Sequence, residues 1–192
     1  MIKVIVLGLF SFGLSAYCHS STANKLSYHY YDIEVNKVSR LFDFVKKAGP
    51  KVGGRNAWAT LNWDLNTEYM LRSTEDGCRL IANQVYVVGQ ATLPQWKNSH
   101  LLTKSDQKWW LEFSQFILEH EKNHYQNALV GVEHIVSNLK EQPISDTCSQ
   151  AKQKYYSIKN DALNKVHKLD LKLDKLTRRR FASNERLFSR LN

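Results

Sequence analysis

The pentapeptide His120-Glu121-Lys122-Asn123-His124 has the residue types and spacing of a zinc-dependent hydrolase site. On a helix, His120 and His124 lie about one turn apart, so their neutral imidazoles can bind the same metal ion. Glu121 then projects beside the metal, where it can accept a proton from a bound water molecule. We predict His120 and His124 as zinc ligands and Glu121 as the general base in metal-assisted hydrolysis of an amide.

The alternative is a pair of packed histidines at a helix interface, with Glu121 as a solvated charge. A single buried histidine is more often a packing residue than a ligand. Here two histidines, a glutamate and an apolar stripe occur together, and this combination favours the metal site.

A long helix must carry this motif. Thr103 or Ser105 can cap its N-terminus, and the pair Thr103 and Asp106 resembles a capping box. The helix is predicted to end near Glu141, before Pro143. Residues at steps of three or four form one stripe that includes both histidines: Trp109, Phe113, Phe116, His120, His124, Asn127 and Gly131. Both histidines are therefore expected to face inward.

A catalytic zinc site has a third protein ligand and keeps one position open for water. His134 is on the same helix, but it lies roughly 15 Å beyond His124 along the axis, which is too far to share the ion. A second long helix, predicted over residues 146 to 180, should pack back on the first as a helical hairpin. It offers three donors on one face: His167, Asp170 and Asp174. For each of them alone, the alternative is a solvated polar stripe.

The first half of the chain has strand patterns separated by turn signals. We predict strands over residues 26 to 35, 58 to 65, 68 to 73 and 78 to 92, and a short helix over residues 37 to 47. Residues 74 to 77 form a hairpin-type turn, and Pro94 should end the last strand because proline cannot donate to a ladder. The predicted fold class is α+β, with a small antiparallel sheet packed on two long helices.

The N-terminal segment has the features of a secretory signal peptide. Lys3 precedes an apolar run over residues 4 to 16, which is shorter than the roughly 20 residues of a membrane span. We predict a signal peptide over residues 1–20, cleaved after Ala16 or a few positions later. Residues 21–192 then form a single metalloprotease-like domain that is secreted or periplasmic.

Export would allow Cys78 and Cys148 to form a disulfide. The third cysteine, Cys18, falls within the predicted signal peptide. The bond would close a long loop and contribute roughly 4 kcal/mol in the chain-entropy model. Two free buried thiols are the alternative.

The C-terminal tail carries most of the positive charge. The chain has a net charge of +9, and residues 152–192 hold 7 Lys and 5 Arg against 4 acidic residues, a net of +8. Such a tail could contact an anionic component of the cell envelope, such as lipid head groups or polysaccharide. Nucleic acid is not an expected partner. A solvated helix face is the alternative.

With these residues in view, the chain resembles a bacterial family of predicted secreted zinc-dependent proteases, catalogued as a domain of unknown function. The resemblance covers nearly all of the mature chain. Its elements occur in order: Tyr31-Asp32, residues 54 to 63, Cys78, residues 93 to 96, the motif helix, Cys148 and a terminal segment. The resemblance implies peptidase activity with a zinc cofactor on a protein or peptide substrate, and it specifies no particular substrate.

The terminal segment of the family reads Tyr-Asp-x-x-Thr-x-His-Gly, and residues 173 to 180 match it in part. Asp174 and Thr177 agree with the pattern, whereas Arg179 and Arg180 replace its histidine and glycine. If the family's last ligand is the histidine, this chain lacks it. If that ligand is the aspartate, the site is complete, so we predict Asp174 as the third zinc ligand.

Other assignments stay open at this point. Asp170 or His167 could supply the third ligand in place of Asp174. The departure from the family pattern also favours a different class of protein, a non-catalytic exported binding protein for an anionic envelope component. A closed structural zinc site with four protein ligands is a further alternative.

Overall fold

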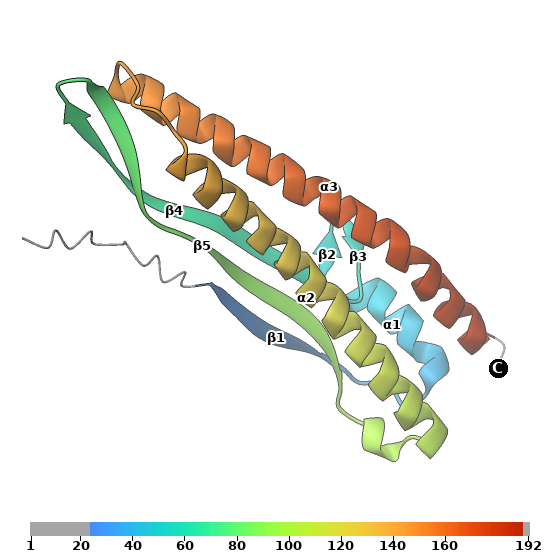
Figure 1. Ribbon diagram of the computed structural model, residues 1–192. Coiled ribbons are helices and arrows are strands. Elements are labelled where there is room, and N and C mark those ends of the chain that lie inside the picture. Colours follow the sequence, from blue (N-terminus) through green and yellow to red (C-terminus); the bar gives the residue numbers. More distant parts are fainter. Residues whose placement is uncertain (1–23, 190–192) are drawn as a thin grey trace, which may run out of the picture.

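The computed structural model describes the backbone of residues 24–189 and the side chains of residues 24–178. The predicted signal peptide lies outside the described residues. The elements occur in the order β1 (Lys25–Ile33), η1 (Val38–Arg40), α1 (Leu41–Ala48), β2 (Lys51–Val52), β3 (Arg55–Asn56), β4 (Thr60–Thr74), β5 (Gly77–Trp96), η2 (Ser99–Leu101), α2 (Lys104–Lys140) and α3 (Cys148–Ser189). Figure 1 shows an elongated molecule in which α2 and α3 run side by side along the sheet. The predicted α+β class is confirmed.

The three-stranded sheet has the order β1-β5-β4 and is mixed, not purely antiparallel as predicted. Strands β4 and β5 form a long antiparallel hairpin, but β1 runs parallel to β5, from Lys25 opposite Val88 to Ile33 opposite Trp96. Parallel neighbours need a crossover connection. The chain between β1 and β5 supplies it with α1, the small β2–β3 pair and β4.

The two strands predicted over residues 58 to 65 and 68 to 73 are one strand, β4. The register with β5 shifts between Glu68 and Tyr69, which marks a β-bulge or a similar irregularity. Glu68 pairs with Gln84 and Tyr69 with Ala82, so the extra residue is in β5 and not in β4. Strand β4 is continuous across Asn66, a residue type that is uncommon in strands and that lies between the two predicted strands.

Strand β5 also extends past its predicted end. Pairing with β4 stops at Thr92, two residues before Pro94, whereas pairing with β1 continues through Pro94 to Trp96. The proline therefore coincides with the end of the ladder on the β4 side of the sheet and does not end the strand.

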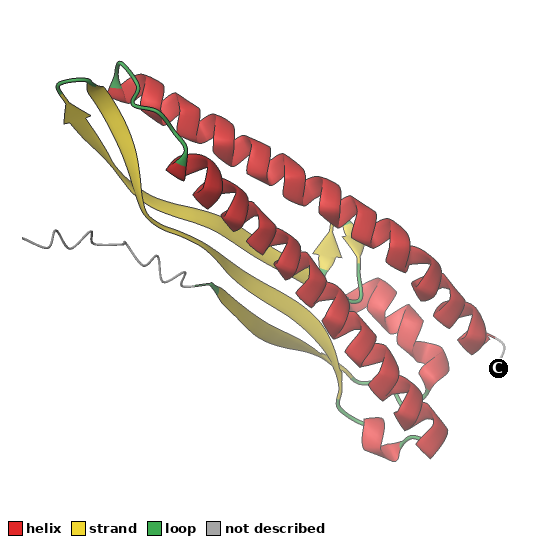
Figure 2. Ribbon diagram, in the orientation of Figure 1, coloured by secondary structure: helices red, strands yellow, loops and turns green. Residues whose placement is uncertain are grey.

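Helices α2 and α3 cover one face of the sheet (Figure 2). The predicted N-cap of α2 is confirmed, because the Thr103 side chain accepts a hydrogen bond of 3.2 Å from the Asp106 backbone N–H. The two helices approach closely at Gly131, where a Cβ atom would lie 2.9 Å from Cγ2 of Val166. This contact helps to set the relative position of the two helices. No helix within residues 24–189 is long and apolar enough to span a membrane.

Helix α2 is buried along two adjacent lines of residues. The predicted stripe carries His120 and His124, whose side chains are only 10% and 15% exposed. The most buried line runs next to it and consists of Trp110, Phe113, Ile117, Glu121, Tyr125, Ala128, Val132 and Ile135. Glu121 is the only charged residue on that line, and it is 5% exposed. The carboxyl group of Glu121 is therefore buried, and it is not a solvated charge on the helix surface.

Cys78 and Cys148 form the predicted disulfide, across a sequence separation of 70 residues. The bond joins the start of β5 to the start of α3. Next to it, the backbone of Cys78 exchanges two hydrogen bonds with that of Ser145, at 2.7 and 2.9 Å. These contacts tie the tip of the long hairpin to the loop between the two helices.

Candidate metal centre

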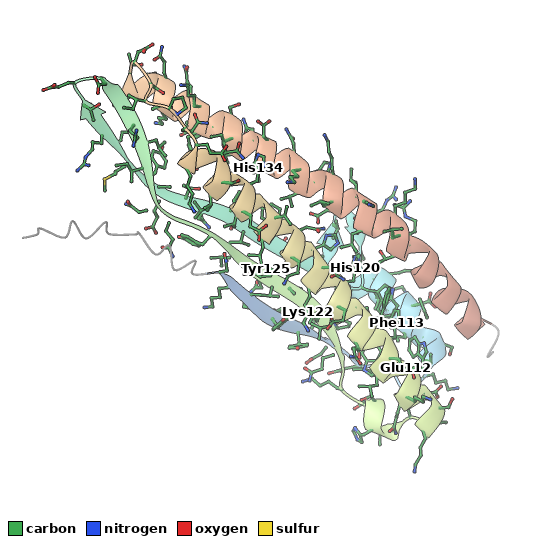
Figure 3. All side chains as sticks on the ribbon, viewed as in Figure 1. Glu112, Phe113, His120, Lys122, Tyr125 and His134 are labelled. Atoms are coloured by element: carbon green, nitrogen blue, oxygen red, sulfur yellow. A yellow bond between two sulfur atoms is a disulfide. The ribbon has the colours of Figure 1, made fainter. Side chains whose placement is uncertain are left out.

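Three ligand atoms from α2 and α3 meet halfway along the helix pair. Nε2 of His120 and Nε2 of His124 are 3.1 Å apart. Oδ1 of Asp174 lies 3.4 Å from the first nitrogen and 3.1 Å from the second. Figure 3 shows His120 near the middle of α2. The helix brings the two histidines together, and the packing of α3 adds the carboxylate.

The spacing of these three atoms fits a tetrahedral metal ion. Ligands at about 2.0–2.2 Å from zinc are separated from one another by about 3.3–3.6 Å in a tetrahedron. The observed separations of 3.1, 3.1 and 3.4 Å are close to these edges. Within the described side chains, His120, His124 and Asp174 form a three-member donor group, and such a group leaves the fourth position open.

Asp170 contacts the donor group through the second ring nitrogen of His124. Its Oδ1 lies 2.8 Å from Nδ1 of His124 and accepts a second hydrogen bond, also of 2.8 Å, from the Asn127 side chain. A carboxylate acceptor at Nδ1 keeps the proton on that nitrogen, so the lone pair is on Nε2, the atom that faces the other donors. Asp170 thus selects the tautomer of His124 that can bind a metal.

The two histidines differ in their affinity for protons. Burial, together with the nearby His124, lowers the pKa of His120 below its ordinary value. Burial also opposes protonation of His124, but the hydrogen bond and the charge of Asp170 outweigh it and raise the pKa of that imidazole. The pair is therefore asymmetric, because Asp170 forms its hydrogen bond with His124.

Glu121 is the buried acid next to this group. Burial raises its pKa to about 7, mainly because the charged form loses its hydration. A carboxyl group with a pKa near neutral can both accept and donate a proton at physiological pH. This is the property expected of a residue that first removes a proton and then returns it.

A cleft of about 880 Å³ opens onto the donor group. One wall consists of residues 51–53 and 56–63, and the other contains the three motif side chains together with Asp170, Asp174 and Arg178. A smaller hollow of about 470 Å³ at the disulfide end is lined by residues 73–78 and 146–148 and contains no histidine. The larger cleft is thus the one suited to a metal and a substrate.

The wall of the cleft formed by residues 51–53 and 56–63 is held in place by aromatic packing. The Trp58 ring makes edge contacts with Phe42 and Phe113, at centroid distances of 5.1 and 4.8 Å. The Tyr31 hydroxyl donates a 3.0 Å hydrogen bond to the backbone carbonyl of Trp58. These contacts connect β1, α1 and α2 to the segment that faces the donor group.

The structure separates the three sequence candidates for the third ligand. Asp174 belongs to the donor group, and Asp170 contacts His124 from the other side of the imidazole. His167 is exposed and lies about 10 Å from Asp174 along α3. His134 lies farther along α2, away from His120 (Figure 3).

Several residues at the site were not assigned a role from the sequence. Asn127 belongs to the predicted stripe, three residues after His124, and that spacing was a usable signal for a supporting contact. Lys51, Trp58 and Arg178 line the cleft from elements distant in the sequence. No local pattern indicates that they meet at the metal centre.

The sequence matches, over residues 28–181, the family described as "Bacterial protein of unknown function (DUF922)". Because the match covers most of the chain, the protein belongs to this family. No curated protein and no solved structure shows a significant match to it.

Proposed function

We propose that this member of a bacterial family of unknown function is an exported zinc-dependent metallopeptidase. The proposal rests above all on one observation, the approach of Nε2 of His120, Nε2 of His124 and Oδ1 of Asp174 to within 3.1–3.4 Å of one another. Two imidazoles and one carboxylate are a known ligand set for catalytic zinc. The open fourth position and the adjacent buried acid support a catalytic role over a closed structural site.

When bound, zinc would act as a Lewis acid that activates a water molecule and polarises the scissile carbonyl. His120, His124 and Asp174 would hold the ion, and Asp170 would orient His124. Glu121 would accept a proton from the attacking water and then donate it to the leaving amine. Hydrolysis consumes one water molecule. Its hydroxyl group becomes part of the new C-terminal carboxylate, and its proton is added to the new N-terminal amine.

Export is part of the proposal. The predicted signal peptide motivates it, and the disulfide between Cys78 and Cys148 supports it, because such bonds persist in oxidising compartments. A periplasmic or secreted location follows for the mature protein.

The test replaces Glu121 with glutamine. We expect Glu121→Gln to lower the rate of peptide hydrolysis by about 10²–10⁴-fold, the usual contribution of a general base, while the bound metal is retained. Elemental analysis identifies the metal and its stoichiometry, and mass spectrometry of a pooled peptide library detects new termini. Glu119→Gln is the matched control, since Glu119 lies two residues away on the exposed side of α2 and pairs with Lys122. Equal activity in both variants would remove Glu121 from the mechanism.

A second candidate is a non-catalytic exported protein that binds an anionic envelope component. The observation that favours it is the exposure of four lysines on α3 at steps of three and four: Lys165, Lys168, Lys172 and Lys175. Purified protein that contains no metal but binds anionic vesicles in a salt-dependent manner would support this candidate over the peptidase.

A further inference from the structure

Arg178 lines the cleft beside the candidate metal centre. It follows Asp174 by four residues on α3, a spacing at which an aspartate and an arginine commonly form an ion pair. Asp174 instead directs its carboxylate to His120 and His124. Among the carboxylates that the structure describes, none is paired with Arg178. The guanidinium is therefore available to a ligand in the cleft.

Lys51 supplies a second cation from a different element. It belongs to the short strand β2, is exposed, and lines the same cleft. It likewise has no ion pair with a described carboxylate. Strand β2 and helix α3 both contribute residues to the cleft, so the two cations come from elements that border one space.

The two aspartates of the cleft already have partners. Asp170 accepts hydrogen bonds from His124 and Asn127, and Asp174 faces the two histidines. A divalent ion at the donor group would balance the charge of the two aspartates. Lys51 and Arg178 then leave the cleft positive even when Glu121 is ionised. Such a cleft attracts anionic ligands.

We propose that Arg178, assisted by Lys51, binds a carboxylate of the substrate, so that this protein prefers acidic peptides. This inference rests on the proposed peptidase function. A guanidinium binds a carboxylate with two parallel hydrogen bonds, which fixes orientation as well as position. Arg178 is thus a specificity-determining residue.

The position of the carboxylate on the substrate follows from the helix geometry. Arg178 lies one helical turn, about 6 Å, from Asp174 along α3. An extended peptide advances about 3.3–3.6 Å per residue. The carboxylate should therefore be one or two residues from the scissile bond. It is either an Asp or Glu side chain or the α-carboxylate of the substrate.

The experiment measures binding and not turnover. Zinc-loaded Glu121→Gln protein is titrated with fluorescent hexapeptides of Ala and Gly that carry one Glu or one Gln, each with a free or an amidated C-terminus. We expect at least one carboxylate peptide to bind about tenfold more tightly than its amide counterpart, as a charged hydrogen-bonded pair would give. If the preference is lost when Glu in the peptide is exchanged for Gln, Arg178 binds the side-chain carboxylate. If it is lost when the C-terminus is amidated, Arg178 binds the α-carboxylate.

Arg178→Gln in the same background should remove this preference and leave the affinity for the amide peptides unchanged. Lys51→Gln should reduce it by less, and Arg178→Lys should retain part of it. Lys172→Gln is the matched control, because Lys172 is exposed on α3 and does not line the cleft. A preference that survives Arg178→Gln, or an equal loss for acidic and amide peptides, would overturn the proposal. An effect of Lys172→Gln as large as that of Arg178→Gln would overturn it too, by assigning the preference to diffuse charge.

Failure of this inference is distinguishable from failure of the proposed function. If the parent protein hydrolyses peptides without any preference for acidic ones, only the inference about Arg178 is wrong. If the protein binds acidic peptides through Arg178 but hydrolyses none of them, the inference about binding holds and the proposed peptidase function is wrong.

Discussion

The carboxylate of Asp170 lies 2.8 Å from Nδ1 of His124, so a residue of α3 controls which nitrogen of a residue of α2 can bind a metal. Asn127 holds the same carboxylate oxygen at 2.8 Å. The contact crosses the interface between the two long helices. The candidate metal centre is therefore built into the helix packing and does not depend on a flexible loop.

The first prediction concerns this contact. Asp170→Asn removes the charged acceptor at Nδ1 of His124 and should weaken zinc binding by about 10–100-fold, the usual effect of losing such a partner. Competition with a chromophoric chelator measures the affinity. Asp161→Asn is the control, since Asp161 is exposed on the same helix and undergoes the same change of charge. If both variants lose zinc affinity to the same extent, the cause is the general change of charge and not the loss of the contact with His124.

The second prediction separates the candidates for the third ligand. Asp174→Ala removes one of the three donor atoms and should weaken metal binding more than Asp170→Asn does. His167→Ala should have no effect, because His167 is exposed and outside the donor group. With cobalt in place of zinc, the visible absorption spectrum reports the change of ligands. An unchanged spectrum in Asp174→Ala would exclude Asp174 as a ligand.

The third prediction concerns removal of the metal. A ligand at 100 times its dissociation constant stabilises the folded state by about 2.7 kcal/mol. For a domain of this size, a chelator should therefore lower Tm by roughly 5–10 °C. Calorimetry with and without the chelator measures the shift. The double variant His120→Ala, His124→Ala should show no shift, and a shift of equal size in that variant would place the metal elsewhere.

The fourth prediction concerns the disulfide. Replacing both Cys78 and Cys148 with serine should lower the free energy of unfolding by about 4 kcal/mol, because the closed loop of 70 residues constrains the unfolded chain. Urea denaturation measures the change. The bond lies at the tip of the β4–β5 hairpin, so zinc affinity at low denaturant should stay the same. A parallel loss of zinc affinity would mean that the hairpin tip positions the metal centre.

The fifth prediction concerns alkaline pH. Burial raises the pKa of Tyr31 well above its ordinary value, so the folded state favours the neutral phenol. The stability that this group contributes is full below about pH 10, the pKa in the unfolded chain, and is lost as the pH rises above it. Tyr31→Phe should cost about 1 kcal/mol near pH 7, because the hydrogen bond to Trp58 is lost, and should flatten the alkaline decline. Tyr30→Phe, at a residue that is 50% exposed, is the control in the same urea titrations from pH 7 to 11. If the stability of Tyr31→Phe declines as steeply with rising pH as that of the parent protein, other groups cause the alkaline decline.

Much of the site was predictable because its spacing is local. His120, Glu121 and His124 occupy one helix, and the helix geometry alone relates the two imidazoles. The cap at Thr103 and the pairing of Cys78 with Cys148 were also predictable, since each depends on residue type and chain position. The motif and the cap are local in sequence, whereas the disulfide followed from the cysteine count, because Cys78 and Cys148 are the two cysteines outside the predicted signal peptide.

The sequence predicted the sheet less well. Asn66 interrupts a run of strand-favouring residues, so the single strand β4 resembles two strands. The parallel pairing of β1 with β5 joins residues about 60 positions apart, and no local pattern specifies its direction. Long-range pairing depends on the packing of the whole domain.

The sequence alone determined that a helix would present two histidines to the interior of the protein, with a glutamate next to the first of them. Only the tertiary structure decided what completes the site. His167, Asp170 and Asp174 lie close together on α3, and their roles differ because of the register between α2 and α3. Close contacts such as Gly131 with Val166 help to set that register, and it places Asp174 at the donor group and Asp170 behind His124. The same packing brings Arg178 and Lys51 to one cleft, because side chains from distant elements meet only when the core forms.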